Sequence, residues 1–433
     1  MKLRKIETNF NKGIFMQENL LENVDFFKDA DIVLNEKSLT NNVLGFGGAI
    51  TEASGYCYKN LSEEEKKNFI NSIKLSNYTF FRLPIGSSDF SLSSYSYSVK
   101  KDLSDFTIKR DLEYIIPLLK DIMAVTPNIK LLASPWSPPK FMKTTNLLVL
   151  GGKLKEKYRK LYAEYISKYI LEYKKLGIDI DYITPQNEPG AVQVWESCLY
   201  SAEEEKEFIR DYLFPTFKEN NIETKIIIYD HNKDKLLKRA LDIYEDESLL
   251  KMTSGLGFHN YTGNYFEKLT EFKNCFPEKL LIHTEGCVGF SKFKEGDEIK
   301  NAEYYLYDLI GDLNSGTNGY IDWNILLDEK GGPNHKKNYC NSPIMVRENK
   351  LYKNLCYFYI SHVTRFIHPN AKKIEIISKL DGLDITSFKN EDGEIIIVIL
   401  NKTNSDYNFK LNVLDNTFSD TSYAHSIKTY ILK

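Results

Sequence analysis

Eight short apolar runs recur along the chain, and each one ends in a group of polar and aromatic residues. They lie at 45–55, 79–86, 130–136, 181–189, 225–232, 255–263, 279–286 and 319–328. Longer stretches with helical character separate them, which is typical of parallel βα units. Eight such units, with polar residues gathered where the runs end, predict an α/β fold built on a (β/α)8 TIM barrel. In such a barrel the active site lies at the carboxyl ends of the strands.

Local signals support the helical stretches. Ser62 and Glu65 are spaced as a capping box at the start of SEEEKKNFINSIK, and Gly177 is placed as the C-cap of the long stretch before the fourth run. The segment 45–48, GFGG, superficially suggests a dinucleotide-binding turn. It lacks the third glycine and the ribose-binding acid of that motif. We therefore favour a barrel over a doubly wound sheet.

The texture of the sequence changes after about Phe366. Short β-rich runs alternate with turns such as 391–393 and 404–405, which predicts antiparallel hairpins. This tail is too small for a sandwich of its own, so we expect N-terminal strands to complete it. The prediction is a small β-sandwich side domain built from both chain termini: residues 1–42 contribute strands, 43–365 form the catalytic barrel, and 366–433 form the C-terminal part of the sandwich.

Composition excludes several classes of partner. The 433 residues carry a formal net charge of -3 without a basic stripe, so we expect no nucleic acid partner. No run is long and apolar enough to span a bilayer, which predicts no membrane insertion. The start has no apolar signal-peptide core, and the six cysteines form no CxxC pair. We expect a cytoplasmic protein, or a secreted one if a signal has been removed; the oligomeric state stays open.

Two glutamates are the strongest candidates for chemistry. Glu188 follows Asn187 at the end of the fourth run, and Glu285 follows Thr284 at the end of the seventh. Strands four and seven face each other across a barrel mouth, so both side chains point into one cleft. Hydrolysis of a glycosidic bond needs two carboxyl groups, one that protonates the leaving oxygen and one that attacks or activates water. A single glutamate after a strand is more often a surface residue; the opposed pair favours catalysis.

Six segments, in order, give the sequence a specific resemblance. They are GFGGAITEAS (45–54), FRLPIGSSDFSLSSYSY (81–97), LLASPWSPPKFMKT (131–144), ITPQNEPG (183–190), TEGC (284–287) and DWNILLDEKGGPN (322–334). This pattern resembles glycoside hydrolase family 30, which includes glucosylceramidases. The resemblance implies a retaining enzyme without a cofactor, with Glu188 as general acid/base and Glu285 as nucleophile. The scattered histidines, which show no HExxH or EF-hand spacing, likewise predict no metal.

The resemblance also assigns residues that contact the sugar. Asn187 matches the residue that hydrogen-bonds the 2-hydroxyl, and Asp89 matches a carboxylate that binds hydroxyls of a terminal sugar. The other matches to substrate-binding positions are Trp136, His259, Tyr261 and Trp323, with Arg82 beside the nucleophile. Each has a structural interpretation too: the tryptophans suit a core, His259 suits a buried hydrogen-bonded histidine, and Arg82 suits a structural ion pair.

The predicted function is hydrolysis of terminal β-linked sugars from a small glycoside or oligosaccharide, with β-glucosides favoured. An endo-acting β-1,6-glucanase or xylan hydrolase, and a β-xylosidase or β-fucosidase, remain alternatives within the family. A carbohydrate-binding protein without activity is disfavoured because both glutamates are present. A barrel aldolase or isomerase is disfavoured because no phosphate loop follows runs seven and eight.

Overall fold

Eight parallel strands form a closed barrel in the computed structural model, which describes residues 2–25, 28–289 and 296–433. Neighbouring strands follow the order β4–β11–β10–β9–β8–β7–β6–β5. Their bounds are β4 Gly45–Gly48, β5 Phe80–Ile85, β6 Lys130–Pro135, β7 Tyr182–Ile183, β8 Lys225–Asn232, β9 Thr253–His259, β10 Leu280–Glu285 and β11 Gly319–Asp322. Backbone bonds from Thr79 to Phe46 and from Ile50 to Arg82 join the first strand to the second and close the barrel. The predicted (β/α)8 fold is confirmed.

The glycine-rich segment serves this closure. Gly47 lies in β4, and a Cβ atom there would collide with the carbonyl oxygen of Phe80 on β5. Only glycine lets the two backbones approach so closely. The segment is therefore part of a barrel strand and not a nucleotide-binding turn.

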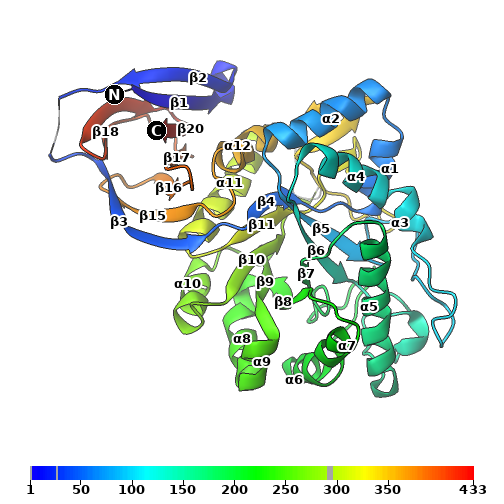
Figure 1. Ribbon diagram of the computed structural model, residues 1–433. Helices are drawn as coiled ribbons and strands as arrows, with labels where there is room; N and C mark the ends of the chain where they lie inside the picture. The colour runs from blue at the N-terminus through cyan, green and yellow to red at the C-terminus, as the bar shows by residue number, and fades with distance from the viewer. Residues whose placement is uncertain (1, 26–27, 290–295) are drawn as a thin grey trace.

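Helices surround the barrel (Figure 1). They are α1 Glu52–Lys59, α2 Glu63–Leu75, α3 Lys109–Glu113, α4 Ile115–Val125, α5 Arg159–Lys175, α6 Ala202–Glu207, α7 Phe214–Glu219, α8 Leu236–Tyr244, α9 Glu247–Met252, α10 Phe266–Cys275, α11 Glu298–Asn314 and α12 Leu355–Thr364. Ser62 caps α2 by accepting from the Glu65 amide, but the Glu65 carboxylate accepts from the Leu351 amide instead of completing the box. A small sheet of β12 Leu326–Asp328, β13 Ile344–Arg347 and β14 Lys350–Lys353 follows the last barrel strand.

Strands from both ends of the chain form the second domain. Its sheet has the order β19–β18–β3–β15–β16–β17–β20–β1–β2, so three N-terminal strands join six C-terminal ones. Their bounds are β1 Lys2–Asn9, β2 Ile14–Glu22, β3 Ile32–Asn42, β15 Lys372–Ser378, β16 Leu383–Lys389, β17 Ile395–Asn401, β18 Tyr407–Val413, β19 Asn416–Ser422 and β20 Ser426–Leu432. The sheet folds over its own apolar core, since β19 also contacts β2 and β20. Both termini lie in this β-sandwich, beside the barrel (Figure 1).

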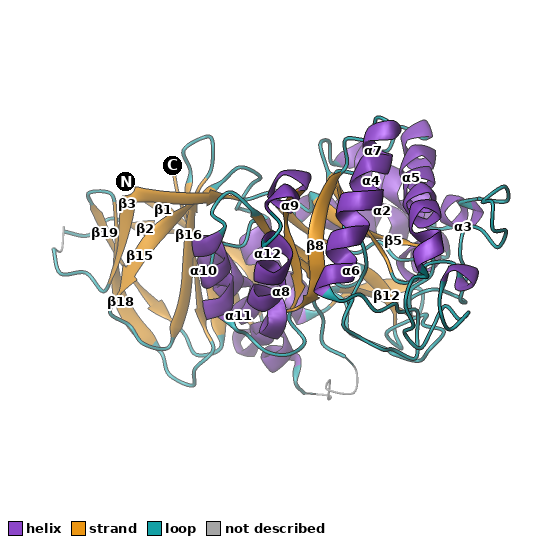
Figure 2. Ribbon diagram, turned by 90° about the horizontal axis from the view of Figure 1, so that it is seen from below, coloured by secondary structure: helices purple, strands orange, loops and turns teal. Residues whose placement is uncertain are grey.

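The two domains share a packed interface. Helices α11 and α12 contact strands of the sandwich and continue the barrel wall (Figure 2). His362 on α12 is completely buried there, with Nδ1 and Nε2 each 2.9 Å from a threonine hydroxyl, of Thr429 and Thr8 respectively. Among the helices of the described residues, none has the length and hydropathy to cross a membrane.

Candidate active site

A cavity of about 280 Å³ opens at the carboxyl ends of the barrel strands. Both candidate glutamates line it, together with Asp89, Phe90, Trp136, Asn187, Gln193, Trp195, His231, Asn232, Tyr261, Cys287, Gly289, Trp323, Asn338 and Cys340. These residues lie together because the residues at the carboxyl ends of successive barrel strands all lie at the same rim of the barrel.

The two glutamates approach each other from β7 and β10. A carboxylate oxygen of Glu188 lies within 4.8 Å of one of Glu285, with a ring nitrogen of His259 equally near. Glu188 has a φ of +47°, in the left-handed region that non-glycine residues rarely adopt. Its amide bonds to the Asp230 carbonyl at 2.9 Å and fixes this turn. Unfavourable backbone conformations held by surrounding bonds are concentrated at functional sites.

Beneath Glu285 lies a completely buried layer of polar groups. Arg82 on β5 donates to Glu285 Oε2 at 2.5 Å and to Asp230 at 2.8 Å. It also donates to Asn187 Oδ1 at 2.8 Å, which fixes the orientation of that amide. Burial would raise the pKa of Asp230, but Arg82 and the hydrogen bonds from His259 and other neighbours hold it below its usual range. Asp230 thus stays ionised and fixes the guanidinium.

His259, at the end of β9, lies between the buried Asp230 and the cavity residue Glu188. Its Nε2 lies 3.1 Å from Asp230 Oδ1, and its Nδ1 lies 3.3 Å from Glu188 Oε1. Burial alone would lower its pKa, but the charges of Glu285, Asp230 and Glu188 raise it to about 9. The imidazole is therefore a cation that donates to both carboxylates.

Burial and neighbouring charges shift the pKa values of Glu188 and Glu285 in opposite directions. Burial raises the pKa of Glu285, although His259 and Arg82 oppose the rise. Burial also disfavours the ionised form of Glu188, but the hydrogen bond and charge of His259 outweigh it and lower that pKa. Hydrogen-bond lengths favour charge on Glu285, which accepts at 2.5 Å from Arg82 and at 2.8 Å from Tyr261. Glu188 accepts at the longer distance of 3.3 Å from both His259 and Gln193, so the ionised form of Glu285 is the more strongly hydrogen-bonded of the two.

Aromatic rings and one carboxylate form the far wall. Trp136 and Trp323 stack with ring centroids 5.3 Å apart, and Phe90 meets Trp323 edge-on. Asp89 accepts from Asn338 Nδ2 at 2.9 Å. Burial raises the pKa of Asp89 to about 7, against the hydrogen bond from Asn338. A wall of apolar faces with one carboxylate suits a sugar ring, which has apolar C–H faces and hydroxyl donors.

Two clusters of described residues have ligand atoms close enough to hold a metal ion: Glu188–His259–Glu285 and His283–Asp308–Asp312. A cation already neutralises each cluster. Arg82 bonds to Glu285, and Lys233 Nζ lies 2.5 Å from Asp312. A divalent ion would face a buried guanidinium or ammonium at contact distance, which disfavours metal at both places.

Comparison with known proteins identifies the family of the fold. Residues 43–367 match the glycosyl hydrolase family 30 TIM-barrel domain, and residues 370–430 match the β-sandwich domain of the same family. The chain belongs to glycoside hydrolase family 30. This family 30 hydrolase is 32% identical over 425 residues to putative glucosylceramidase 4 of Caenorhabditis elegans. The match covers 92% of the chain and 81% of the relative. Mouse lysosomal acid glucosylceramidase is 28% identical over 92% of the chain and 83% of its own length.

Solved structures agree with this assignment. SrfJ from Salmonella typhimurium is 34% identical and superposes with a TM-score of 0.96 over 100% of both chains. The endo-β-1,6-glucanase BT3312 is 28% identical, with a TM-score of 0.87 over 99% of both chains. The protein is therefore a glycoside hydrolase with a family 30 barrel and sandwich.

Arg82 and His259 lie beside Glu285, where the resemblance places them, but neither is exposed to the cavity. Arg82 and His259 are completely buried below the glutamates and are not part of the cavity lining. Both are too deep to touch a sugar and act on the carboxylates instead. The remaining predicted site residues line the cavity: Asp89, Trp136, Asn187, Glu188, Tyr261, Glu285 and Trp323.

Sequence reasoning missed several residues of the site. Asp230 and His231 lie at the end of β8, where the sequence shows the same polar signal as at the ends of the other strands. Gln193 and Asn338 come from long loops, where no periodicity marks a side chain that turns inward. Only the folded loop shows that Asn338 orients Asp89.

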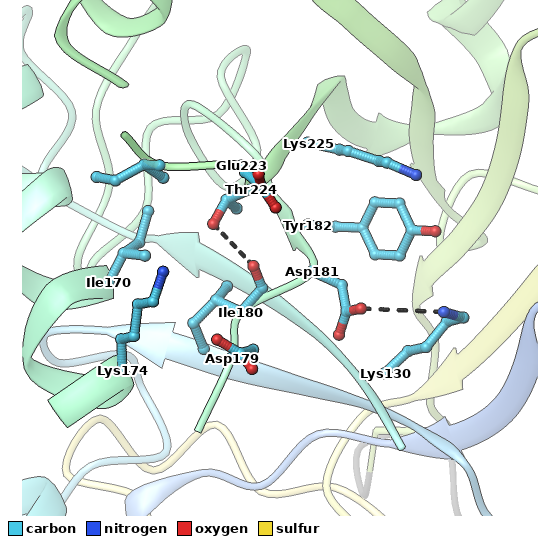
Figure 3. A pocket seen from close by; sticks show the side chains of 11 residues that line it. Lys130, Ile170, Lys174, Asp179, Ile180, Asp181, Tyr182, Glu223, Thr224 and Lys225 are labelled. Carbon is cyan, nitrogen blue, oxygen red and sulfur yellow. Dashed lines mark hydrogen bonds and ion pairs between the residues drawn. The ribbon is translucent and has the colours of Figure 1, made fainter. Parts of the chain in front are cut away.

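A second pocket lies at the opposite end of the barrel. It has a volume of about 470 Å³ and lies where β6, β7 and β8 begin (Figure 3). Two of its charged groups pair with each other: Lys130 lies 3.9 Å from Asp181, whose carboxylate also accepts from the Leu131 amide. This face of a barrel serves stability and not catalysis.

Proposed function

We propose that this family 30 hydrolase is a retaining enzyme that removes terminal β-linked sugars, with β-glucosides as the favoured substrates. The separation of Glu188 and Glu285 carries the proposal, since their nearest ligand oxygens lie within 4.8 Å. Retaining enzymes hold the two carboxyls about 5–5.5 Å apart, whereas inverting enzymes need about 6.5–9.5 Å to admit a water molecule. Glu285 attacks the anomeric carbon, and Glu188 protonates the departing oxygen.

The surrounding donors suit both halves of a double displacement. Tyr261 and Arg82 hold Glu285 ionised and aimed while it attacks. His259 stabilises the charge that Glu188 acquires when it gives up its proton. After the glycosyl ester forms, Glu285 is neutral, and the anionic Glu188 takes a proton from the water that attacks the ester.

Asp89 supports action on a terminal sugar. It lines the cavity at the wall of Trp136 and Trp323, and it is 3% exposed. A cavity of about 280 Å³ lies just below the roughly 300–1,000 Å³ typical of ligand sites, and this small size suits a single sugar ring.

An apolar rim supports an apolar leaving group. Val192 and Val194 are 59% and 60% exposed, and the residues next to them, Gln193 and Trp195, line the cavity on the side of Glu188. Leu150 bonds to Gln193 through its amide and is also exposed. The leaving group lies on the acid/base side, so these side chains favour a lipid-like or aryl aglycone. Similarity to the glucosylceramidases agrees with this substrate class.

A second candidate is an endo-acting β-1,6-glucanase. Its support is the likeness to BT3312 and a 24% identical endo-1,6-β-D-glucanase of Aspergillus fumigatus. The two functions differ in their products, because an exo enzyme releases one sugar and an endo enzyme releases oligosaccharides of mixed length.

A panel of nitrophenyl glycosides tests the main proposal, with product sizing on a β-1,6-glucan for the second. We expect turnover of β-glucosides. Activity only on β-xylosides or β-fucosides would show that the enzyme prefers a different terminal sugar. Turnover of no β-linked sugar would refute the proposed function. Azide added to Glu285→Gly should yield an α-glycosyl azide, and azide added to Glu188→Gly should yield the β-azide. The reverse pattern would exchange the two roles.

A further inference from the structure

Four charged or ionisable side chains form a buried cluster behind β10, outside the cavity. We call Lys233, His283, Asp308 and Asp312 the α11 cluster, because its two aspartates lie on α11. All four side chains are 0–1% exposed. Lys233 Nζ lies 2.7 Å from Asp308 and 2.5 Å from Asp312, and His283 Nδ1 lies 2.7 Å from Asp312. Burying this many charges is costly, and apolar side chains of the same volume often stabilise a fold equally well.

The cluster touches the catalytic strand at one point. His283 Nε2 lies 2.9 Å from the backbone carbonyl oxygen of Glu285. A carbonyl only accepts, so Nε2 carries a hydrogen and donates it. Asp312, held by Lys233, binds the other ring nitrogen and fixes the plane of the imidazole. One rigid donor therefore reaches the backbone of the residue whose side chain lines the cavity.

Strand geometry gives this contact a purpose. In a regular strand His283 and Glu285 would share a face, and His283 faces α11. The pairing between β9 and β10 shifts between these two residues, and the shift lets Glu285 turn into the barrel mouth. Thr284, between them, points inward to Asp230. The bond from His283 to the Glu285 carbonyl spans this irregular turn.

The next residue shows how tightly this turn is packed. A Cβ atom on Gly286 would lie 2.6 Å from His283 Nε2 and 2.9 Å from Asn260 Oδ1. Asn260 in turn donates to Asp308 at 2.9 Å. The imidazole can therefore hold the carbonyl only because residue 286 has no side chain.

We propose that His283 is a positioning residue for Glu285, oriented by the lysine and aspartates of the α11 cluster. The proposal rests on the role of Glu285 as nucleophile. His283 is not in the cavity lining and touches no sugar. Its loss should slow attack on the anomeric carbon and leave sugar binding unchanged, since a displacement of about 1 Å can cost about 10²-fold in rate.

Covalent trapping separates attack from binding. The 2-deoxy-2-fluoro analogue of the best sugar in the panel, with a dinitrophenyl leaving group, is incubated with each full-length variant. For His283→Ala we expect the inactivation rate constant to fall about 30–100-fold, with the binding constant of the reagent within about twofold of wild type. His283→Gln, which can offer an amide donor to the carbonyl, should recover part of the rate.

His362→Ala is the matched control. This histidine is also completely buried with both nitrogens hydrogen-bonded, but it lies at the interface with the sandwich. We expect it to lower Tm and to leave the inactivation rate within about threefold. Asp312→Asn keeps the volume of the cluster and should give an intermediate loss, which provides a test if His283→Ala does not fold.

The outcomes separate the two proposals. If wild-type enzyme turns over substrates but the trapped sugar is not attached to Glu285, the proposed roles fail. If Glu285 is labelled, and folded His283→Ala or Asp312→Asn reacts at the wild-type rate, positioning is refuted. Equal losses in the His283 and His362 variants, or a loss confined to reagent binding, would also refute it.

Discussion

Arg82 donates a 2.5 Å hydrogen bond to Glu285 from a completely buried position beneath the cavity. It thus stabilises negative charge on Glu285, the proposed nucleophile, from outside the cavity lining. The same guanidinium packs 4.8 Å from the ring of Trp136 and bonds to Asp230, so its place is fixed on several sides. The proposed mechanism therefore gives the ion pair between Arg82 and Glu285 a catalytic role in addition to a structural one.

Replacing this arginine tests that conclusion. Arg82→Lys keeps a charge but loses the fork that spans Glu285 and Asp230, so we expect kcat to fall about 10²–10³-fold with little change in KM. Steady-state kinetics with Tm as a folding check measure this. Arg110→Met, which removes a partly buried arginine paired with Glu52 outside the cavity, is the control and should keep kcat. A large rise in KM with unchanged kcat would contradict the assignment.

Substrate binding should depend on the ionisation of Asp89. Burial raises its pKa to about 7, so it loses its charge as the pH falls through about 7 and then accepts sugar hydroxyls poorly. We expect KM to rise from about pH 8 to about pH 6 in the wild type, and to be high and independent of pH in Asp89→Asn. Asp111→Asn is the control, because that carboxyl is buried outside the cavity with a pKa raised to about 7. A flat wild-type profile would contradict the prediction.

The barrel was predictable because its signal is local and repeated. Each strand reads as an apolar run and ends in polar residues, as in the segment from Leu280 to Glu285. The sandwich was predictable in kind, since a tail with too few strands implies partners from the other terminus. The sequence placed Arg82 beside Glu285 but did not show that Arg82 and His259 lie below the cavity, because that depth depends on how neighbouring strands stagger.

Long loops set the second limit on prediction. Asn338 donates a hydrogen bond to Asp89, which lies 249 residues earlier in the sequence, and no pattern around Asn338 predicts this contact. The turn at Glu285 depends on an irregular pairing with β9, which periodicity does not reveal. Such features arise from tertiary contacts and become visible only in the folded chain.

The apolar rim should discriminate between leaving groups. Val192→Ser and Val194→Ser remove exposed apolar surface beside Glu188, so we expect KM for an octyl β-glucoside to rise about 3–10-fold. KM for a methyl β-glucoside should not change, because that aglycone does not reach the rim. Leu241→Ser, on the 48% exposed leucine of α8, is the control for a general surface effect. An equal change in KM for both substrates would show that the apolar rim does not bind the aglycone.

Cys287 should make the enzyme sensitive to small thiol reagents. It is half-buried, lines the cavity, and has Sγ 3.6 Å from the Tyr261 hydroxyl that bonds to Glu285. Attack of its thiolate on methyl methanethiosulfonate forms a mixed disulfide and releases methanesulfinate, and the added methylthio group fills space meant for the sugar. Cys340 also lines the cavity, but burial raises the pKa of its thiol well above the usual range, so Cys340 reacts poorly. We expect the reagent to inactivate the wild-type enzyme, and a competitive sugar to slow the inactivation. Cys287→Ser should resist the reagent. Cys275→Ser, which changes an exposed cysteine on α10, is the control and should be inactivated like the wild type. Continued inactivation of Cys287→Ser at the wild-type rate would show that another thiol controls access to the site.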